Sequence, residues 1–205
     1  MGHIRQLSEN LANKIAAGEV VERPASVIKE LTENSIDAKA KSITILVEQG
    51  GTSSMSVIDD GIGMNRTDAL LCFSRHATSK IVDENDLFNI TTLGFRGEAI
   101  PSIAAVSRVE LLTSLKNEPG VLIISTPSSP LVKRDALSID GTMFKVNDLF
   151  FNTPARLKYL KSDRAEISSI IDVIEKFAIS YPEIAFELAI DNKVILKTNG
   201  RGNIL

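Results

Sequence analysis

The spacing of hydrophobic residues predicts that residues 22–38 form one amphipathic helix, with Pro24 in its first turn. Because each helical residue is rotated by about 100° from the last, the small and apolar side chains of this stretch fall on one arc. The arc comprises Val27, Ile28, Leu31, Ser35 and Ala38. Glu30, Asn34 and Asp37 line up beside it as a polar stripe. Such a stripe is most often a solvated face, so the helix alone does not indicate a function.

Apolar residues at every second position predict two groups of strands. Residues 43–47 and 55–57 alternate on either side of a turn at residues 50–52, and the second of these strands delivers Asp59 at its end. The later predicted strands span residues 109–113, 121–125, 131–136, 142–146, 185–190 and 194–198. The last two form a hairpin across residues 191–192.

Four further helices are predicted from capping residues and from apolar positions three or four apart. They are expected to begin at Ser8, after Asn65, at Glu98, and at Ser162 or Asp163. Gly18 is well placed to end the first, because glycine favours the C-terminal cap. The second is expected over residues 67–74 and the third over residues 98–106. The buried side of the last comprises Ile167, Ile170, Ile171, Ile174 and Phe177.

This order of elements predicts an α/β sandwich in which helices pack on one face of a mixed, mostly antiparallel sheet. Residues 1–20 are expected to form an N-terminal arm and the first helix, and residues 21–199 one domain. Residues 75–97 read mostly as loop, with one expected helical turn at residues 83–88, and a loop this long is usually functional, often a lid. Residues 200–205 resemble the start of a linker to a second domain.

The composition indicates a soluble globular protein, since 43% of the 205 residues are hydrophobic. Lysine and arginine total 23 against 26 for aspartate and glutamate, so the net charge of −3 gives no general attraction to nucleic acid or to an anionic membrane. No apolar run approaches the roughly 18 residues that a membrane span needs. Cys72 is the only cysteine, which excludes an internal disulfide and favours a small buried hydrophobe. These features favour a reducing, cytosolic compartment.

The glycine signatures of P-loop and Rossmann sites are absent from the sequence, so a nucleotide pocket has to be of another kind. Short motifs of acids, amides and glycines instead follow one another along the chain. They are Glu30-x-x-x-Asn34, Asp59-x-Gly61-x-Gly63, Gly94-x-x-Gly97 and Gly141-Thr142. Each alone is weak, since Asp-Asp-Gly is also a common turn. The ordered set resembles the GHKL ATPase superfamily, which has the Bergerat-type fold.

Within that superfamily, longer motifs resemble the signatures of MutL mismatch-repair proteins. They are IAAGEVVERPAS at residues 15–26, RHATSK at 75–80, GFRGEA at 94–99 and FNTPAR at 151–156. The resemblance covers nearly all of the chain. It implies an N-terminal GHKL-type ATPase domain, with ATP and Mg²⁺ as cofactors and with residues 75–97 as the nucleotide lid.

The residue types fit the adenine site that the resemblance implies. The carboxylate of Asp59 can accept a hydrogen bond from the exocyclic amine of adenine. Gly61 and Gly63 let the base approach the backbone closely, and Thr142 is expected to support the site.

The polar stripe fits the catalytic centre. Asn34 is the expected ligand of Mg²⁺, because this ion takes few protein oxygens and keeps several waters. Glu30, one helical turn before Asn34, is the expected general base for the water that attacks the γ-phosphate. Glu33 lies about 60° away around the helix and is the weaker candidate.

The phosphate side of the site is expected around two glycines. Gly94 and Gly97 precede a helix, whose N–H groups and dipole can hold phosphates. Lys80, with Thr78 and Ser79, is expected to reach phosphate from the lid, although an exposed loop lysine is the ordinary alternative. By resemblance, the nucleotide site further includes Asp37, Met64, Leu93, Phe95, Arg96 and Glu98.

The resemblance implies an ATP-binding and slowly ATP-hydrolysing domain that acts as a nucleotide-driven dimerisation switch and couples mismatch recognition to strand removal. The expected partners are ATP or ADP, a second copy or a paralogue, a MutS-type mismatch-recognition protein, and DNA, mainly through regions outside this chain, with no membrane. The expected location is the bacterial cytosol, or the nucleus of a eukaryote. Because family members supply a γ-phosphate lysine from their second domain, this chain alone is expected to be weak or inactive.

Two other functions stay open from the sequence. One is a DNA-binding interaction module with a vestigial nucleotide site, which the intact Glu30, Asn34 and Asp59 argue against. The other is a kinase of the same superfamily, which would need a phosphoacceptor histidine. A basic cluster comprises Arg156, Lys158, Lys161 and Arg164. Acids lie among these residues, which favours a solvated helix face over contact with nucleic acid.

Overall fold

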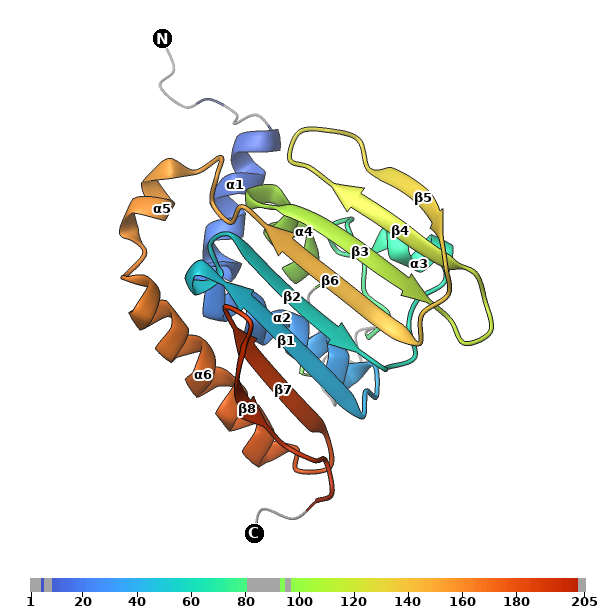
Figure 1. The fold of residues 1–205 in the computed structure, drawn as a ribbon. Helices are drawn as coiled ribbons and strands as arrows, with labels where there is room; N and C mark the ends of the chain where they lie inside the picture. The colour runs from blue at the N-terminus through green and yellow to red at the C-terminus, as the bar shows by residue number, and fades with distance from the viewer. Residues whose placement is uncertain (1–4, 6–8, 81–92, 95–96, 203–205) are drawn as a thin grey trace.

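The computed structural model describes residues 5, 9–80, 93–94 and 97–202. Its centre is an eight-stranded sheet in the order β5-β4-β3-β6-β2-β1-β7-β8, with helices against one face (Figure 1). The strands are β1 (Ser42–Glu48), β2 (Ser54–Asp59), β3 (Arg108–Ser114), β4 (Gly120–Ser125), β5 (Val132–Ala136), β6 (Gly141–Asn147), β7 (Ala185–Ile190) and β8 (Lys193–Lys197). The helices are α1 (Glu9–Val20), α2 (Pro24–Asp37), α3 (Arg66–Leu71), α4 (Ala99–Val106), α5 (Pro154–Tyr159) and α6 (Asp163–Ser180), with a 3-10 turn η1 (Gln49–Gly51). Within the described ranges, no helix combines the length and apolar character needed to cross a membrane.

The predicted mixed, mostly antiparallel sheet is confirmed. Strands β1 and β7 run parallel, whereas the other neighbouring strands pair antiparallel. The register between β2 and β6 places Asp59 opposite Thr142. Side chains that face each other across neighbouring strands lie on the same side of the sheet. The register therefore brings together two predicted site residues that are distant in the sequence.

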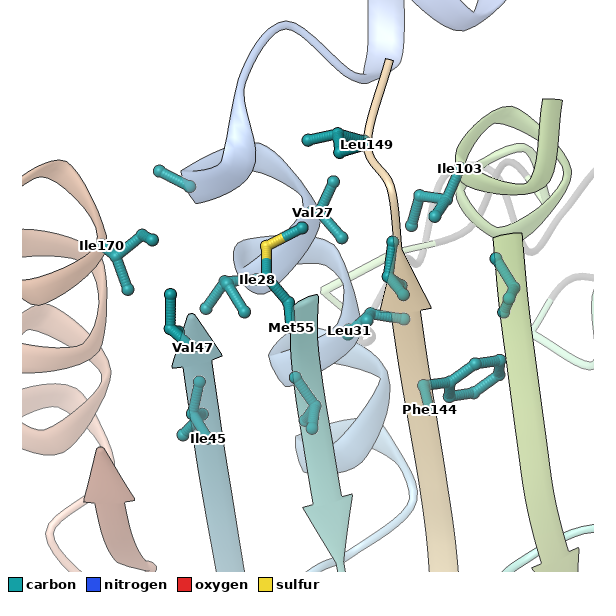
Figure 2. Packing of buried hydrophobic residues seen from close by; sticks show 14 of the residues in the cluster. Val27, Ile28, Leu31, Ile45, Val47, Met55, Ile103, Phe144, Leu149 and Ile170 are labelled. Atoms are coloured by element: carbon teal, nitrogen blue, oxygen red, sulfur yellow. The ribbon is translucent and has the colours of Figure 1, made fainter. Parts of the chain in front are cut away.

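The core lies between the sheet and helix α2, which crosses behind the central strands (Figure 2). Val27, Ile28 and Leu31 of α2 are almost completely buried, as the predicted apolar arc requires. They pack toward inward-facing side chains of β1 and β2, including Ile45 and Met55. Burying one such side chain is worth about 1.5–3 kcal/mol. This packing fixes the rotation of α2, and with it the direction of the polar stripe.

An ion pair between distant segments fixes the start of α2. Arg23 precedes the helix in an extended conformation, and Pro24 occupies the first turn. The guanidinium of Arg23 donates to both carboxylate oxygens of Glu166 in α6, at 3.1 and 2.9 Å. Glu166 is only 1% exposed, so the two-point hydrogen bonding offsets the cost of burying its charge. The helix predicted over residues 22–38 is slightly shorter in the structure, where α2 spans Pro24–Asp37. Arg23 lies outside the helix because it forms the ion pair with Glu166.

The prediction that Gly18 ends the first helix is wrong, because α1 continues to Val20. A Cβ atom at Gly18 would lie 1.7 Å from Nη2 of Arg156, so the glycine makes room for that guanidinium. The sequence analysis also missed the short helix α5, which begins at Pro154. The helix predicted over residues 67–74 spans Arg66–Leu71 and is capped as expected, since the Asn65 side chain accepts from two backbone N–H groups.

Two of the predicted features lie outside the described residues, namely the Ser8 cap and the helical turn at residues 83–88. The remaining predicted strands are confirmed to within a few residues. The last predicted helix begins at Asp163, with Ser162 at its N-cap position and no side-chain cap hydrogen bond.

Candidate functional site

Asp59 ends β2 and is only 7% exposed. Both of its carboxylate oxygens accept hydrogen bonds, one from the hydroxyl of Ser35 at 2.6 Å and the other from the backbone N–H of Gly61 at 2.9 Å. Burial raises the pKa of the Asp59 carboxyl above its ordinary value, and these two hydrogen bonds oppose part of that rise. The arrangement holds one buried acceptor group in a fixed orientation at the end of the strand.

A threonine that the sequence analysis missed connects the elements around Asp59. The hydroxyl of Thr113, on β3, lies 3.0 Å from the carbonyl oxygen of Gly141 and 3.1 Å from the hydroxyl of Thr142. It also accepts the backbone N–H of Met64 at 3.0 Å. Thr113 is completely buried, so it fixes the turn after Asp59 against β6. The available signal was a threonine at an inward position of the predicted strand over residues 109–113.

Two glycines in this region are required by close contacts with neighbouring backbone. Gly63 has a φ of +69°, and a Cβ there would lie 1.9 Å from the carbonyl oxygen of Ser114. Gly141 has a φ of +100°, and a Cβ there would lie 1.9 Å from the carbonyl oxygen of Asp59. No other residue fits without moving a strand end. The turn after Asp59 is therefore packed against two strands, which an isolated acid-glycine turn would not be.

Glu30 lies on the predicted polar stripe, and 28% of its side chain is exposed. Burial raises the pKa of its carboxyl above the ordinary value, while the ammonium of Lys29, 3.6 Å away, partly opposes this. Glu33 differs from Glu30, because Lys29 forms a shorter ion pair with it, at 2.8 Å. Glu30 thus has a carboxylate less committed to a partner and a proton affinity shifted toward neutral pH, as a general base requires.

Asn34, Asp37 and Lys80 form one cluster. The ammonium of Lys80 donates to Oδ1 of Asn34 at 2.9 Å and to Oδ2 of Asp37 at 2.6 Å. The Asp37 carboxylate also accepts the backbone N–H groups of Leu93, at 3.2 Å, and Gly94, at 3.4 Å. The structure therefore brings together five of the predicted site residues, and Lys80 is not the solvated loop lysine of the ordinary alternative.

Other predicted phosphate-side residues lie in residues 76–79 and 97–98, two segments that contact each other. Oε1 of Glu98 lies 2.9 Å from Nδ1 of His76, and a Cβ at Gly97 would lie 2.5 Å from the carbonyl oxygen of Ala77. Thr78 and Ser79 are exposed, and the Thr78 hydroxyl accepts the backbone N–H of Lys80 at 3.1 Å. Two predicted site residues, Phe95 and Arg96, lie outside the described residues.

Cys72 and the predicted basic cluster were the other candidates for a functional site in the described part of the chain. Burial raises the pKa of the Cys72 thiol to about 12, so it is a poor nucleophile. The guanidinium of Arg156 lies 5.9 Å from the ring centroid of Phe150, whereas the other members of the basic cluster are exposed. No group of three or more metal-binding acids, cysteines or histidines occurs among the described residues.

Comparison with known families assigns this arrangement. A sequence profile described as "Histidine kinase-, DNA gyrase B-, and HSP90-like ATPase" matches residues 22–125, which include α2, Asp59 and Lys80. A DNA mismatch repair protein MutL from Geobacillus thermodenitrificans is 52% identical over 204 residues, 100% of this chain. The chain belongs to the MutL branch of this ATPase family. The resemblance inferred from the motifs is thereby confirmed, and so is the GHKL-type fold.

Other relatives agree with this assignment. MutL of Bacillus anthracis is also 52% identical over 204 residues. Among solved structures, an Aquifex aeolicus MutL ATPase domain complexed with ADP is 29% identical, with a TM-score of 0.69 over 88% of this chain and 65% of that chain. The N-terminal domain of a DNA repair protein is 27% identical, with a TM-score of 0.78 over 95% of this chain and 58% of that chain. The chain spans about a third of the length of the MutL sequences it matches.

Proposed function

We propose that this chain binds adenine nucleotide next to Asp59 and hydrolyses ATP with Glu30 as general base. The observation that carries the proposal is the Asp59 carboxylate, buried at a strand end with both oxygens oriented by Ser35 and Gly61. Ser35 belongs to the same helix as Glu30 and Asn34, so one rigid element connects the adenine side and the catalytic side. The ADP complex of the Aquifex aeolicus MutL domain supports this use of the fold.

Recognition of the base depends on the remaining hydrogen-bonding capacity of Asp59. A carboxylate oxygen has more than one acceptor direction, so Asp59 can accept the exocyclic amine of adenine while it keeps its hydrogen bonds to Ser35 and Gly61. A 6-oxo purine presents an acceptor at that position and would face the carboxylate without a proton between them. Thr142 lies opposite Asp59 on the neighbouring strand, and Thr113 hydrogen-bonds to both Thr142 and the N–H of Met64. Thr142 and Met64 are proposed to complete this side of the site.

The proposed general base, Glu30, is the first residue of the polar stripe on α2. Glu30 takes a proton from water as the water oxygen attacks the γ-phosphorus, the bond from that phosphorus to the bridging oxygen breaks, and ADP leaves with the bonding electrons. The raised pKa of Glu30 makes it a stronger base than an exposed glutamate. Glu33 is the weaker candidate because Lys29 neutralises it at closer range.

The residues present also fit Mg²⁺. This ion prefers oxygen ligands and needs only one or two from the protein when phosphates and waters supply the others. Oδ1 of Asn34 already accepts from an ammonium group, so it lies where a cation is stabilised. Asn34 is the residue that would hold the ion, which would neutralise phosphate charge when bound.

The phosphates are proposed to lie near the start of α4. Gly94, Gly97 and Lys80 are the main contacts in this proposal, since backbone N–H groups and an ammonium favour anions. Less direct contacts are proposed for Asp37, Thr78, Ser79, Leu93, Phe95, Arg96 and Glu98.

For the longer protein, we propose a nucleotide-driven dimerisation switch in mismatch repair, working with a MutS-type protein and with DNA bound mainly by other regions. Residues 21–199 would form its ATPase domain and residues 75–97 the lid. A lysine from a following domain would assist turnover, so these 205 residues alone would hydrolyse ATP slowly. A matched pair of polypeptides, ending at Leu205 or after the next domain, tests this by steady-state ATPase rates.

Isothermal titration of the chain with ADP, ATP and GTP, each with Mg²⁺, tests the proposed site directly. We expect heat of binding with both adenine nucleotides and weaker binding of GTP. Equal affinity for ATP and GTP would remove Asp59 from adenine recognition. The absence of heat with any nucleotide would favour the DNA-binding module with a vestigial site.

A further inference from the structure

The ammonium of Lys80 lies on the oxygen that is proposed to bind the metal ion. Its Nζ is 2.9 Å from Oδ1 of Asn34 and 2.6 Å from Oδ2 of Asp37. The side chains of Lys80 and Asp37 are only 19% and 10% exposed, so solvent screens this ion pair much less than a surface pair. The cationic position next to Asn34 is therefore filled by the chain itself.

The carboxylate of Asp37 already accepts hydrogen bonds from three donors. Oδ2 accepts from the Lys80 ammonium and from the N–H of Gly94, and Oδ1 accepts from the N–H of Leu93. These donors come from two separate segments of the chain, and Asp37 connects both of them to the end of α2. A carboxylate beside the phosphates would repel them, so the contribution proposed for Asp37 at the nucleotide site is indirect, through Lys80 and the backbone of residues 93–94.

We propose that Lys80 is an internal substitute for the metal ion and that Asp37 is the positioning residue that holds it on Asn34. Metal and nucleotide then bind by exchange, in which the ammonium of Lys80 leaves Asn34 and moves to phosphate while the metal takes its place. This inference rests on the proposed nucleotide site and assigns to two of its residues roles beyond ligation.

The charges explain why the exchange needs both ligands. Lys80 and Asp37 together are neutral, and adding a divalent ion alone would place two cations around one amide oxygen. That repulsion is large at such short distances. Nucleotide phosphates supply the negative charge that accommodates both the metal and Lys80. The chain should therefore bind metal weakly alone and strongly with nucleotide, and the two ligands should strengthen each other by the same factor.

Binding of Mn²⁺ alone, measured by the loss of its electron paramagnetic resonance signal, tests the proposal on the 205-residue chain. Lys80→Met removes the ammonium and leaves the oxygens of Asn34 and Asp37 available to the ion. We expect its affinity for Mn²⁺ to rise by a factor on the order of ten or more over the parent chain. Lys80→Arg keeps the charge and should show no such gain.

Two further variants separate this role from a merely structural one. Asp37→Asn combined with Lys80→Met removes the carboxylate as well, and should lose most of the gain in Mn²⁺ affinity. Lys133→Met removes an exposed lysine on β5 and should bind Mn²⁺ like the parent chain. Circular dichroism on each variant identifies any that fail to fold, and Lys80→Gln then replaces Lys80→Met.

The outcomes are distinguishable from failure of the proposed function. Titration of the parent chain with Mg-ADP decides whether the nucleotide site exists, and no binding there would remove that site. If the parent binds Mg-ADP but Lys80→Met and Lys80→Gln bind Mn²⁺ no better than it does, Lys80 does not occupy the metal position. An equal gain in Lys80→Arg would mean that lost packing, and not lost charge, opened the site.

Discussion

The hydroxyl of Ser35, on α2, donates to the Asp59 carboxylate at the end of β2 over 2.6 Å. Both residues are buried, so the hydrogen bond joins the central helix to the sheet without exposure to water. Gly61 donates to the other carboxylate oxygen from the following turn. The orientation of Asp59 thus depends on α2, the helix that also carries Glu30 and Asn34.

Removal of this hydroxyl should weaken nucleotide binding. In Ser35→Ala, Asp59 loses the hydrogen bond that opposes the effect of burial, so the pKa of its carboxyl should rise further. We expect a loss of about 1 kcal/mol in binding free energy, roughly fivefold in Kd for ADP. The loss should increase as pH falls, because protonation removes an acceptor for adenine. Ser168→Ala, at an exposed position of α6, is the control, and equal affinities of the two variants would contradict the prediction.

Asp59→Asn should separate stability from binding. The pKa of buried Asp59 is raised above its ordinary 3.8, so the folded chain binds more protons than the unfolded chain between those two pKa values. Its free energy of unfolding therefore falls as pH rises through that window and stays lower above it. Asparagine carries no charge to bury, so at neutral pH we expect Asp59→Asn to melt no lower than the parent. Any excess stability of Asp59→Asn over the parent should disappear in acid, where Asp59 is neutral in both the folded and the unfolded chain.

The same substitution should cost about 1.5–3 kcal/mol of adenine nucleotide binding, the worth of a hydrogen bond to a charged group. Thermal melts over a pH series and calorimetric titrations with ADP measure the two quantities on one sample. A variant that melts well below the parent at neutral pH would contradict the stability prediction, and unchanged ADP affinity would remove Asp59 from adenine recognition.

Local periodicity was enough to predict the strands and α2, because burial repeats every second residue in strands and every three or four in helices. It also placed Asp59 at a strand end. It could not predict that Lys80 pairs with Asn34 and Asp37, since nothing near Lys80 in the sequence specifies a partner so distant along the chain. Such contacts depend on how the packed elements are arranged.

Thr113 and Gly18 show two other reasons why the role of a residue could not be predicted from the sequence. The role of Thr113 depends on the register of β3 against β6, which places it opposite Thr142, and a one-residue slip would turn it to the other face. Gly18 has the residue type of a helix end, but in the structure it provides space for Arg156 inside α1. A glycine can end a helix or leave space for a neighbouring side chain, and its role can be assigned only when its neighbours are known.

Glu30→Gln should slow turnover strongly and leave nucleotide affinity nearly unchanged, because the base acts on the attacking water and not on the bound nucleotide. We expect the ATPase rate to fall by a factor on the order of 10²–10⁴. Glu33→Gln is the matched control on the same helix and should keep most of the activity, since Lys29 already neutralises Glu33. The assay uses a polypeptide extended through the second domain that we propose for the longer protein, so that the parent rate is measurable.

The pH profile gives a second readout of Glu30. A base works only when it is deprotonated, and burial raises the pKa of Glu30 above its ordinary 4.5. The rate should therefore rise as pH increases through that raised value, and the acid limb of the profile should be lost in Glu30→Gln. If Glu33→Gln removed that limb and Glu30→Gln did not, the assignment of the base would be reversed.

Gly63 and Gly202 form a matched pair for the cost of close packing beside the site. Their φ angles are +69° and +73°, so alanine is strained to a similar degree at both, by about 1–2 kcal/mol. A Cβ at Gly202 meets nothing within 4 Å, whereas one at Gly63 would lie 1.9 Å from the Ser114 carbonyl oxygen. We expect Gly63→Ala to lose about 1–3 kcal/mol of stability more than Gly202→Ala.

Gly63→Ala should also weaken ADP binding, because the clash pushes the turn away from Ser114. This movement should break the hydrogen bond between the N–H of Met64 and the hydroxyl of Thr113. Gly202→Ala should bind ADP like the parent. Urea unfolding and calorimetric titration of both variants measure the two effects separately. Equal losses of stability would mean that positive φ alone explains the glycine at position 63, and unchanged ADP binding in Gly63→Ala would mean that the turn after Asp59 does not contact the nucleotide.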